Sequence, residues 1–459
     1  MRFIVALLLI LVLAAGGAYV VAGRAGGPSI QIAKPEKFVG VSTPLEVAVG
    51  APGGQLKSIS IAFEQGGKST ALYSMTDGQV APGEGIKLDG PDLLRITRTI
   101  GKQSVPELKT GPARIVVTAS RPVMRGLRTL SSTASHDVQV RLERPQVAVL
   151  SSKHYINLGG SEMVVYRATP PDVVSGVLVG DIEYPGYPAS GAATIEGVKL
   201  DDPAARIAFF ALRFDQDLNT PIRLFARDEA GDTARADFDH TTFPKPFKSS
   251  RIPLDDKFLD RVVPAILEGT TEVKPEGDTL AKFLVINGEL RRKNAGKIAS
   301  FAKQSAPEIL WRGVVFHPFT NNAVESAFAD KRTYVYKGKE VDQQIHLGFD
   351  LASFTGMKIQ AANRGKVVFA EELGIYGNCV IVDHGMGVQS LYGHLSSIAV
   401  KAGDMVEKEQ ELGRSGMTGL AGGDHLHFTM LVNGHMVNPV EWWDQHWIQD
   451  RILRKLKGA

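Results

Sequence analysis

Side chains that can bind a metal or move a proton gather in the last third of this 459-residue chain. The segment "HLGFDL" holds His346 and Asp350, "SLYGHLS" holds His394, and "DHLHF" holds His425 and His427. Because side chains alternate between the two faces of a strand, His425 and His427 are expected to face one cleft. This pair, with a histidine and a carboxylate from another segment, offers the nitrogen and oxygen ligands of a catalytic zinc site.

Such a site supports hydrolysis. Three protein ligands leave the fourth position of a tetrahedral zinc ion to water. Zinc lowers the pKa of that water from 15.7 to about 7, which provides hydroxide near neutral pH. Peptide hydrolysis also needs groups that move protons and hold a developing oxyanion, and histidines beyond the ligand set suit both tasks. Each motif alone is common by chance, so the hypothesis rests on their conjunction.

The motifs around these residues resemble those of one known family. They are "HLGFDLAS", "YGNCVIVDHGMGVQSLYGHLS", "VKAGDMVEKEQELGRSGMTGLAGGDHLHF" and "NPVEWW", and they cover about residues 312–445. In this order they closely resemble the M23 zinc metallopeptidases, also called LytM or lysostaphin-type endopeptidases. The resemblance implies a zinc-dependent endopeptidase that hydrolyses peptide cross-links or stem peptides of peptidoglycan.

The resemblance also implies a role for each of the five side chains. One Zn²⁺ per chain would be held by His346, Asp350 and His427. His394 and His425 would lie beside the metal as catalytic groups. In the favoured assignment His425 is the general base and His394 orients or stabilises the oxyanion, and the alternative exchanges these two roles.

Several neighbouring residues are expected to shape the site. The resemblance suggests that Tyr376 and Asn378 border the substrate groove, and it makes His384 a structural histidine. The chain departs from the family pattern at His435 and at Asp424, where proline is frequent in relatives. Neither departure removes a ligand, but both bear on the rim of the groove and hence on substrate choice.

Two other functions stay open at this point. Some relatives with this fold have lost metal ligands and act as regulators of other cell-wall hydrolases. Here all five positions are filled, which favours the enzyme. A third hypothesis makes the protein an envelope assembly factor that acts mainly through its N-terminal modules.

The elements that must position the site predict a mostly β chain. With 48 glycines, 24 prolines and few helical runs in the first half, short strands and turns are favoured. Residues 28–143 and 144–244 are expected to form tandem immunoglobulin-like β-sandwich modules, which could dock a protein partner. Residues 245–311 are expected to form a short helical connector, which either packs on its neighbour or acts as a regulatory lid. Residues 312–459 would form an antiparallel-β LytM-type peptidase domain with a C-terminal helix.

The connector and the C-terminal helix carry apolar side chains at positions that suit packing. The apolar face of the connector is expected to consist of Leu280, Phe283, Leu284, Leu290, Ile298 and Phe301. Trp442, Trp443 and Trp447 are interpreted as packing anchors of the final helix. Cys379, the chain's one cysteine, is interpreted as a buried small residue.

The N-terminal segment predicts export. Residues 3–23 carry no charge, lie between Arg2 and Arg24, and are long enough to cross a bilayer. We predict a transmembrane anchor or signal peptide within residues 1–27, with a cleaved secretory signal as the alternative to the anchor. Either way the rest of the chain would lie on the periplasmic side of the inner membrane or be exported, with peptidoglycan as its partner. A net charge of only +3 and the lack of a basic run exclude nucleic acid.

Overall fold

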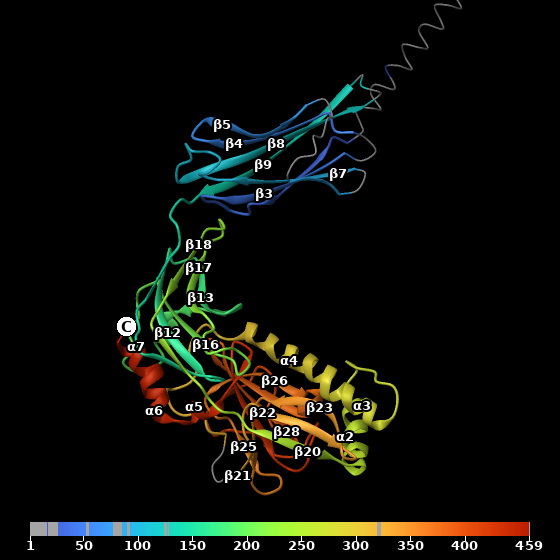
Figure 1. Ribbon diagram of the computed structural model, residues 1–459. Coiled ribbons are helices and arrows are strands. Elements are labelled where there is room, and N and C mark those ends of the chain that lie inside the picture. Colours follow the sequence, from blue (N-terminus) through green and yellow to red (C-terminus); the bar gives the residue numbers. More distant parts are fainter. Residues whose placement is uncertain are drawn as a thin grey trace, which may run out of the picture. The chain divides into compact units, whose positions relative to one another are not determined.

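The structure is a computed structural model that describes residue 16 and residues 26–51, 55–76, 85–89, 92–123, 126, 128–318 and 323–458. Within these residues the chain is mostly β, which confirms the predicted fold class. Contacts divide the chain into two compact units, which Figure 1 colours along the sequence. Unit 1 comprises residues 1–145 and 227–234, and unit 2 comprises residues 146–226 and 235–459.

The predicted N-terminal anchor falls almost entirely outside the described residues. Of residues 1–27, only residues 16, 26 and 27 are described. Over the ranges that the structure does describe, no helix combines the length and the hydropathy of a membrane span. The anchor therefore stays a prediction from the sequence.

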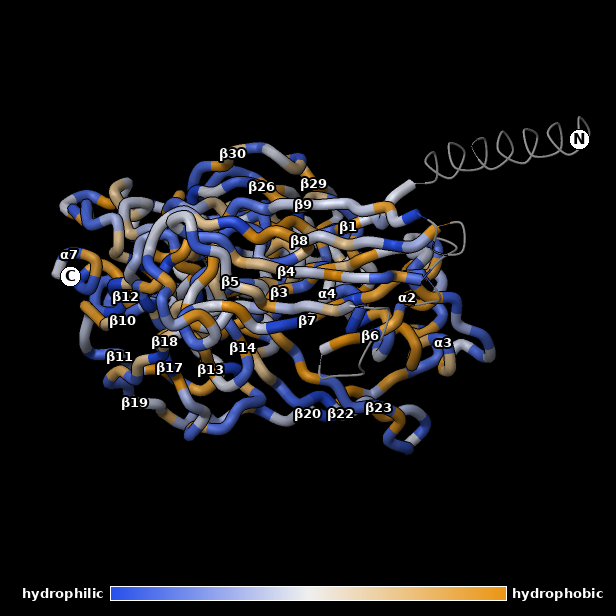
Figure 2. The backbone as a smooth tube through the Cα atoms, turned by 90° about the horizontal axis from the view of Figure 1, so that it is seen from above, coloured by the Kyte–Doolittle hydropathy of each residue, from blue (hydrophilic) through white to orange (hydrophobic). Residues whose placement is uncertain are grey.

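Unit 1 contains two sheets around one apolar core. Buried residues alternate with more exposed ones along its strands because successive side chains point to opposite faces, and Figure 2 shows the matching change of hydropathy along β4 and β8. The first sheet has the order β1 (Ser29–Lys34), β3 (Thr43–Gly50), β7 (Leu93–Ile100), β6 (Ile86–Leu88). The second has the order β2 (Phe38–Val39), β9 (Arg128–Val140), β8 (Gly111–Val123), β4 (Ser58–Gln65), β5 (Lys68–Met75).

Unit 2 begins with a second pair of four-stranded sheets, as expected for a β-sandwich. One sheet has the order β10 (Gln146–Val149), β12 (Ser161–Thr169), β16 (Ala205–Ala211), β15 (Tyr187–Pro188). The other has the order β14 (Ile182–Pro185), β13 (Val174–Val179), β17 (Ile222–Arg227), β18 (Thr233–Asp237). A parallel pair, β11 (His154–Asn157) and β19 (His240–Phe243), and the short helix η1 (Ala189–Ala192) complete it.

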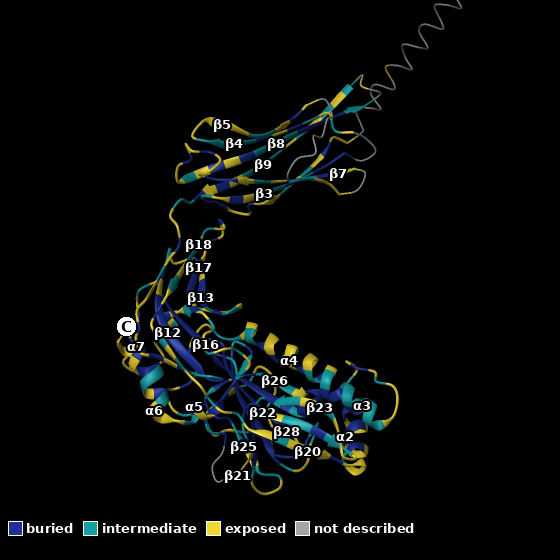
Figure 3. Ribbon diagram, in the orientation of Figure 1, coloured by how far each residue is buried: buried dark blue, intermediate teal, exposed yellow. Residues whose placement is uncertain are grey.

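The C-terminal part of unit 2 is built on an antiparallel eight-stranded sheet. Its order is β21 (Ala323–Ser326), β24 (Phe349–Ala352), β32 (Leu426–Val432), β28 (Val388–Leu395), β27 (Asn378–Gly385), β26 (Gly365–Glu372), β30 (Met405–Val406), and β33 (His435–Val437) also pairs with β32. A small sheet has the order β25 (Lys358–Gln360), β31 (Glu411–Arg414), β29 (Ser397–Ile398). All residues of the central strand β28 are buried, and Figure 3 colours the interior of this part dark blue. The chain ends in α5 (Pro439–Trp443), α6 (Gln445–Trp447), η5 (Ile448–Leu453) and α7 (Arg454–Gly458).

A third sheet joins the connector to this part of the chain. Strand β20 (Ser249–Leu254) pairs in parallel with β22 (Asp330–Tyr336), which pairs antiparallel with β23 (Lys339–His346). The connector thus contributes an edge strand next to the strands that carry the site. Its helical elements follow as α2 (Asp256–Gly269), α3 (Thr279–Val285), η2 (Ile286–Leu290), α4 (Arg291–Ser300) and η3 (Phe301–Gln304).

The connector helices begin where the sequence supplies caps and pack through their apolar faces. The side chains of Asp255 and Asp278 accept hydrogen bonds from backbone N–H groups in the first turns of α2 and α3. Phe283, Leu290 and Ile298 of the predicted apolar face are buried in one core with residues of β27, β28 and η4 (Gly374–Tyr376). Figure 1 shows α2, α3 and α4 beside the strands of the C-terminal part. The connector is therefore a packed layer of unit 2.

The sandwich of unit 2 and the C-terminal part share one continuous core. Trp442 is fully buried, and its indole N–H donates to Ser161 Oγ at 3.0 Å. Lys455 Nζ lies 2.6 Å from Glu162 Oε1 in a pair that is almost completely buried. The domain limits predicted from the sequence stay predictions, but residues 146–226 and the C-terminal part form one body of packed side chains.

Glu441 of α5 gives this contact a pH dependence. Its carboxylate accepts hydrogen bonds from Asn157 Nδ2 at 2.8 Å and from the Ser161 N–H at 2.9 Å. Burial nevertheless raises the pKa of Glu441 to about 7. A carboxyl with a raised folded pKa stabilises the fold below its unfolded pKa, and this stabilisation is lost as pH rises through the folded pKa.

We therefore expect the melting temperature of the protein to fall between about pH 5 and pH 8, with a stability change on the order of 3 kcal/mol from Glu441. Glu441→Gln should remove most of this slope because its amide does not ionise. Thermal unfolding followed by circular dichroism at several pH values measures the effect, with the exposed Glu276→Gln as the control. A Glu441→Gln variant that keeps the full slope would contradict the assignment.

Candidate metal centre

The strand pairing of unit 2 brings the five predicted site residues together. β24 and β32 pair so that Asp350 lies directly opposite His427. His346 is the last residue of β23, and His425 lies just before β32. β28 pairs with the other side of β32 and carries His394 near its end. Residues far apart in the sequence therefore meet where four strands approach one another.

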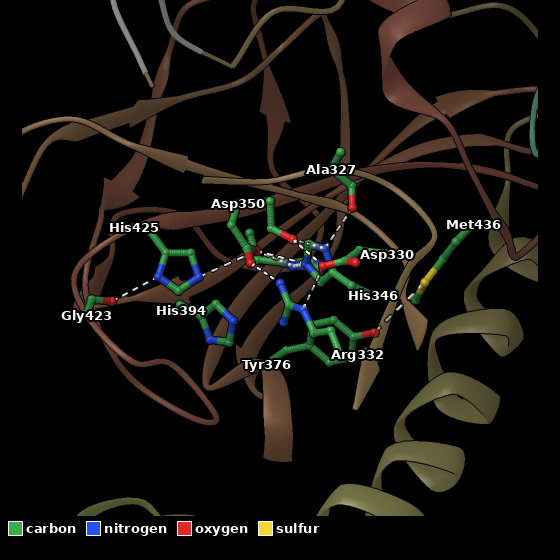
Figure 4. A network of polar contacts seen from close by, with 12 residues as sticks. Ala327, Asp330, Arg332, His346, Asp350, Tyr376, His394, Gly423, His425 and Met436 are labelled. Atoms are coloured by element: carbon green, nitrogen blue, oxygen red, sulfur yellow. Dashed lines mark hydrogen bonds and ion pairs between the residues drawn. The ribbon is translucent and has the colours of Figure 1, made fainter. Parts of the chain in front are cut away.

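His346, Asp350 and His427 form a compact triad. His346 Nε2 lies 2.9 Å from Asp350 Oδ1 and 3.0 Å from His427 Nδ1. His427 Nδ1 lies 3.1 Å from Asp350 Oδ1. All three residues are buried, and Figure 4 shows His346 and Asp350 directed toward a common centre. The triad thus presents two nitrogen atoms and one carboxylate oxygen to a single point.

The donor atoms of this triad fit a cation. His346 Nδ1 lies 3.2 Å from the Ala327 carbonyl oxygen, which can only accept, so His346 Nε2 carries a lone pair. Among the described residues, buried His427 Nε2 has no hydrogen-bond partner, and a proton on that atom leaves Nδ1 free to coordinate. Ligands about 2.0–2.2 Å from a tetrahedral zinc ion lie about 3.4 Å apart, close to the observed spacing. Two neutral imidazoles and a carboxylate therefore suit Zn²⁺ in number and type.

Asp350 is oriented by a second group. Arg332 of β22 donates from Nη2 to Asp350 Oδ2 at 2.7 Å, which leaves Oδ1 for the triad. Arg332 Nε lies 3.7 Å from Asp330 Oδ2. Burial raises the pKa of Asp350, but contacts with His346 and the two histidines near β32 outweigh burial and hold that pKa well below its usual range. The carboxylate is therefore ionised and fixed in direction.

Gly348 makes room for the His427 ring. A Cβ at position 348 would lie 2.5 Å from His427 Cε1 and from His427 Nε2. We expect Gly348→Ala to displace the ring and to weaken metal binding by about 10-fold to 100-fold, as is typical when the support of a ligand is lost. Competition with a chelator measures the affinity. Gly422→Ala is the control because no atom lies within 4 Å of its added Cβ, and equal affinities of both variants would contradict the packing argument.

His394 and His425 lie beside the triad with the same tautomer. The Nδ1–H of His394 donates to the Thr418 carbonyl at 2.8 Å, and that of His425 donates to the Gly423 carbonyl at 2.9 Å. Each ring therefore keeps Nε2 for proton transfer. Their ring centroids are 4.8 Å apart, and His425 Nε2 lies 3.5 Å from Asp350 Oδ1. His394 has a positive φ of 62°, a strained conformation that functional sites often hold.

Their surroundings shift the pKa values of these two histidines in opposite directions. Burial, followed by the neighbouring His425 and His427, lowers the pKa of His394 well below its usual value. Burial also acts to lower the pKa of His425, but the carboxylate of Asp350 and the Gly423 carbonyl together outweigh burial and raise that pKa. The two rings are thus electrostatically distinct although they lie side by side.

Of the two residues expected to border the substrate groove, one lines the groove that opens at the triad. This residue is Tyr376, and its ring centroid lies 5.4 Å from that of His427. Asn378 is absent from the described lining residues, and its side chain donates to the Leu395 carbonyl at 3.0 Å. Its expected role with substrate stays a prediction. Both ring nitrogens of His384 are hydrogen-bonded, to the Arg364 carbonyl and to Ser390 Oγ, which agrees with a structural histidine.

A groove with a volume of about 650 Å³ opens at the triad. His394, His425 and His427 line it together with residues of the connector. Of the two departures from the family pattern, Asp424 accepts a hydrogen bond from Ser415 Oγ at 2.5 Å. His435 packs against Tyr184 with the two rings tilted and their centroids 5.4 Å apart, and its neighbour Met436 lines the groove. The groove is large enough to receive an extended peptide segment at the five site residues.

Sequence reasoning missed the groups that support the triad. Arg332 lies on β22 without a recognisable motif, and its one signal is the run of three charged residues "DKR". The carbonyls of Ala327, Thr418 and Gly423 have no signal in the sequence because every residue has a carbonyl group. Their function follows only from the backbone geometry.

Residues 344–439 match the family model described as Peptidase family M23. The DD-carboxypeptidase/endopeptidase Mpg of Neisseria meningitidis is 38% identical over 97 residues, which are 21% of this chain and 22% of that protein. The peptidoglycan DD-endopeptidase ShyA of Vibrio cholerae is 27% identical over 180 residues, 38% of this chain and 39% of that protein. The murein hydrolase activator EnvC of Escherichia coli is 35% identical over 95 residues, 21% of this chain and 23% of that protein.

These matches are partial. The aligned segments span between about a fifth and two fifths of these three relatives. They include proteins named as peptidases and one named as an activator of hydrolases. The similarity thus concerns the C-terminal part of the chain, where the five site residues lie.

Proposed function

We propose a function on the premise that the C-terminal part of this chain is a domain of peptidase family M23. The protein is a zinc-dependent endopeptidase that hydrolyses peptide cross-links or stem peptides of peptidoglycan. The observation that carries this proposal is the meeting of His346 Nε2, Asp350 Oδ1 and His427 Nδ1 within 3.1 Å of one another, beside two further histidines.

The ligands of the metal are His346, Asp350 and His427. Zinc bound there would supply a Lewis acid that lowers the pKa of water to about 7. Arg332 keeps the carboxylate of Asp350 in place, and the Ala327 carbonyl fixes the tautomer of His346. These supports hold the ligand atoms in position before any substrate binds.

The proton transfers are assigned to the two remaining histidines. His425 Nε2 takes a proton from the attacking water and passes it to the leaving amine, while the Gly423 carbonyl keeps Nδ1–H in place. His394 orients the scissile carbonyl or stabilises the oxyanion, held by the Thr418 carbonyl. The reverse assignment has a similar geometry available, because both histidines line the groove and both hold Nδ1–H on a backbone carbonyl. Tyr376 and Asn378 border the bound substrate in this proposal.

The relatives support the substrate and the location. ShyA is named for peptidoglycan and EnvC for murein hydrolase activation. We place this chain in the cell envelope, on the periplasmic side of the inner membrane, either held by residues 3–23 or exported. The sandwich modules within residues 28–143 and 144–244 act as spacers or dock a protein partner.

A regulator is the second candidate function, favoured by the similarity to EnvC. Such a protein would stimulate another hydrolase without cleaving the wall itself. Retention of all three triad residues and both further histidines supports the enzyme instead. The two functions differ in whether purified protein acts on peptidoglycan alone.

The test uses purified cross-linked sacculi with the full chain. We expect zinc-loaded protein to release new muropeptides and protein stripped by a chelator to release none, with activity restored by added zinc. Chromatography and mass spectrometry of the soluble products give the bond that is cut. Absence of new muropeptides with the zinc-loaded protein would contradict the endopeptidase.

A further inference from the structure

Two basic side chains from the connector line the groove outside the residues that match the peptidase family. Lys248 lies just before β20, and Arg291 is the first residue of α4. Both lie outside residues 344–439. They add positive charge to a site whose triad and proton-transfer groups all come from the C-terminal part.

The connector places Lys248 directly before β20. Lys248, Ser250, Arg251 and Ile252 all line the groove, so the start of this strand borders it. The parallel register sets Ser250 beside Arg332 and Ile252 beside Tyr334 of β22. The sheet of β20, β22 and β23 therefore forms one side of the groove. It carries Arg332, which holds Asp350 in place.

Arg291 is held in a defined orientation. Its Nε donates to the Asn287 carbonyl at 3.0 Å, and its Nη2 donates to Asn287 Oδ1 at 2.6 Å. Asn287 Nδ2 in turn donates to Asp342 Oδ2 at 2.7 Å. These bonds use Nε and Nη2, so Nη1 stays available to a ligand. An arginine fixed in this way loses little side-chain entropy on binding.

Lys248 and Arg291 differ from the other basic residues of the groove in their ion pairing. Arg332 pairs with Asp350 at 2.7 Å, and Arg251 pairs with Glu340 at 2.5 Å. In the described part of the chain, neither Lys248 nor Arg291 has an acidic side chain within ion-pair distance. The other acidic residues that line the groove are Glu325, on the edge strand β21, and Asp330, on β22.

We infer that Lys248 and Arg291 form an anion subsite that binds a free carboxylate on the residue flanking the scissile bond of the substrate peptide. The inference rests on the proposed peptidase function. A carboxylate would accept charge-assisted hydrogen bonds from Arg291 Nη1 and Lys248 Nζ, which are stronger than bonds between neutral groups. A carboxamide in its place has one acceptor fewer and no charge. The chain therefore discriminates between free and amidated forms of one peptide.

The test compares two cross-linked muropeptides that differ only in a carboxylate or a carboxamide on that residue. Binding to the full-length His394→Ala protein is measured by titration calorimetry, and hydrolysis is measured with the unmutated chain. We expect the carboxylate form to bind about tenfold more tightly and to be hydrolysed with a correspondingly higher kcat/KM. Lys248→Gln and Arg291→Gln, each introduced into both proteins, should reduce this preference, and the double variant should abolish it.

Arg292→Gln is the matched control because Arg292 is exposed on the same helix and does not line the groove. It should keep the full preference. Equal binding of the two muropeptides to the protein without connector substitutions would overturn the subsite, and so would an undiminished preference in a double variant with an unchanged melting temperature. Hydrolysis of both muropeptides without preference contradicts the subsite alone. Preferential binding without hydrolysis by the unmutated chain contradicts the endopeptidase alone.

Discussion

Replacing His427 by alanine is expected to remove bound zinc and to abolish hydrolysis of peptidoglycan. The triad would keep His346 and Asp350 only, and two protein ligands fall short of the three that hold a catalytic zinc ion. We expect zinc affinity to fall by at least about 100-fold, since loss of a direct ligand exceeds the usual effect of losing its support. Elemental analysis of the dialysed protein gives the zinc content, and muropeptide release gives the activity.

His446→Ala is the control for the His427 variant, because His446 lies in the short helix α6 and is exposed. It should bind about one zinc ion per chain and keep its activity. A His427→Ala protein with the zinc content of this control would contradict the assignment of His427 as a ligand. Circular dichroism of both variants shows whether the strands around the site remain folded.

Replacing His394 by alanine is expected to leave zinc bound while hydrolysis falls about 10²-fold to 10⁴-fold, the usual contribution of a group that transfers a proton or stabilises developing charge. No atom of His394 belongs to the triad, so the ligand set stays complete. The measurement pairs zinc content with kcat on a soluble cross-linked muropeptide. This pattern, with metal retained and turnover lost, separates a catalytic group from a ligand.

The same experiment separates the roles of His394 and His425. Loss of the general base should remove the limb of the pH–rate profile that reports its ionisation, whereas loss of an oxyanion donor should lower the rate at every pH. Profiles of His394→Ala and His425→Ala therefore decide between the favoured assignment and its exchange. Loss of zinc from His394→Ala would instead place His394 among the ligands.

The five candidate site residues could be singled out from the sequence because each lies in a short motif. Strand alternation placed His425 and His427 on one face, and the resemblance assigned a role to each of the five. The structure brings all five together through the pairing of β24, β28 and β32. The order of those strands depends on contacts between distant segments, which no local pattern of residues encodes.

The supports of the site were not predictable for a physical reason. Arg332 acts on Asp350 through strand pairing in a sheet that includes the connector strand β20. The amphipathic pattern of the connector predicted an apolar face but could not say which surface it covers. In the structure that face packs on β27 and β28, next to Tyr376. The choice of partner surface is a property of the folded chain.

Pairing of β20 with β22 makes the folded body around the candidate site larger than residues 344–439, which match the family model. A fragment beginning at residue 312 would turn β22 into an open edge next to Arg332 and uncover the apolar surface now shared with α2 and α4. Unpaired edges and bare apolar patches favour aggregation over solubility. A fragment that keeps the candidate site folded and soluble should therefore begin upstream of Ser249, in a stretch that contains none of the site motifs.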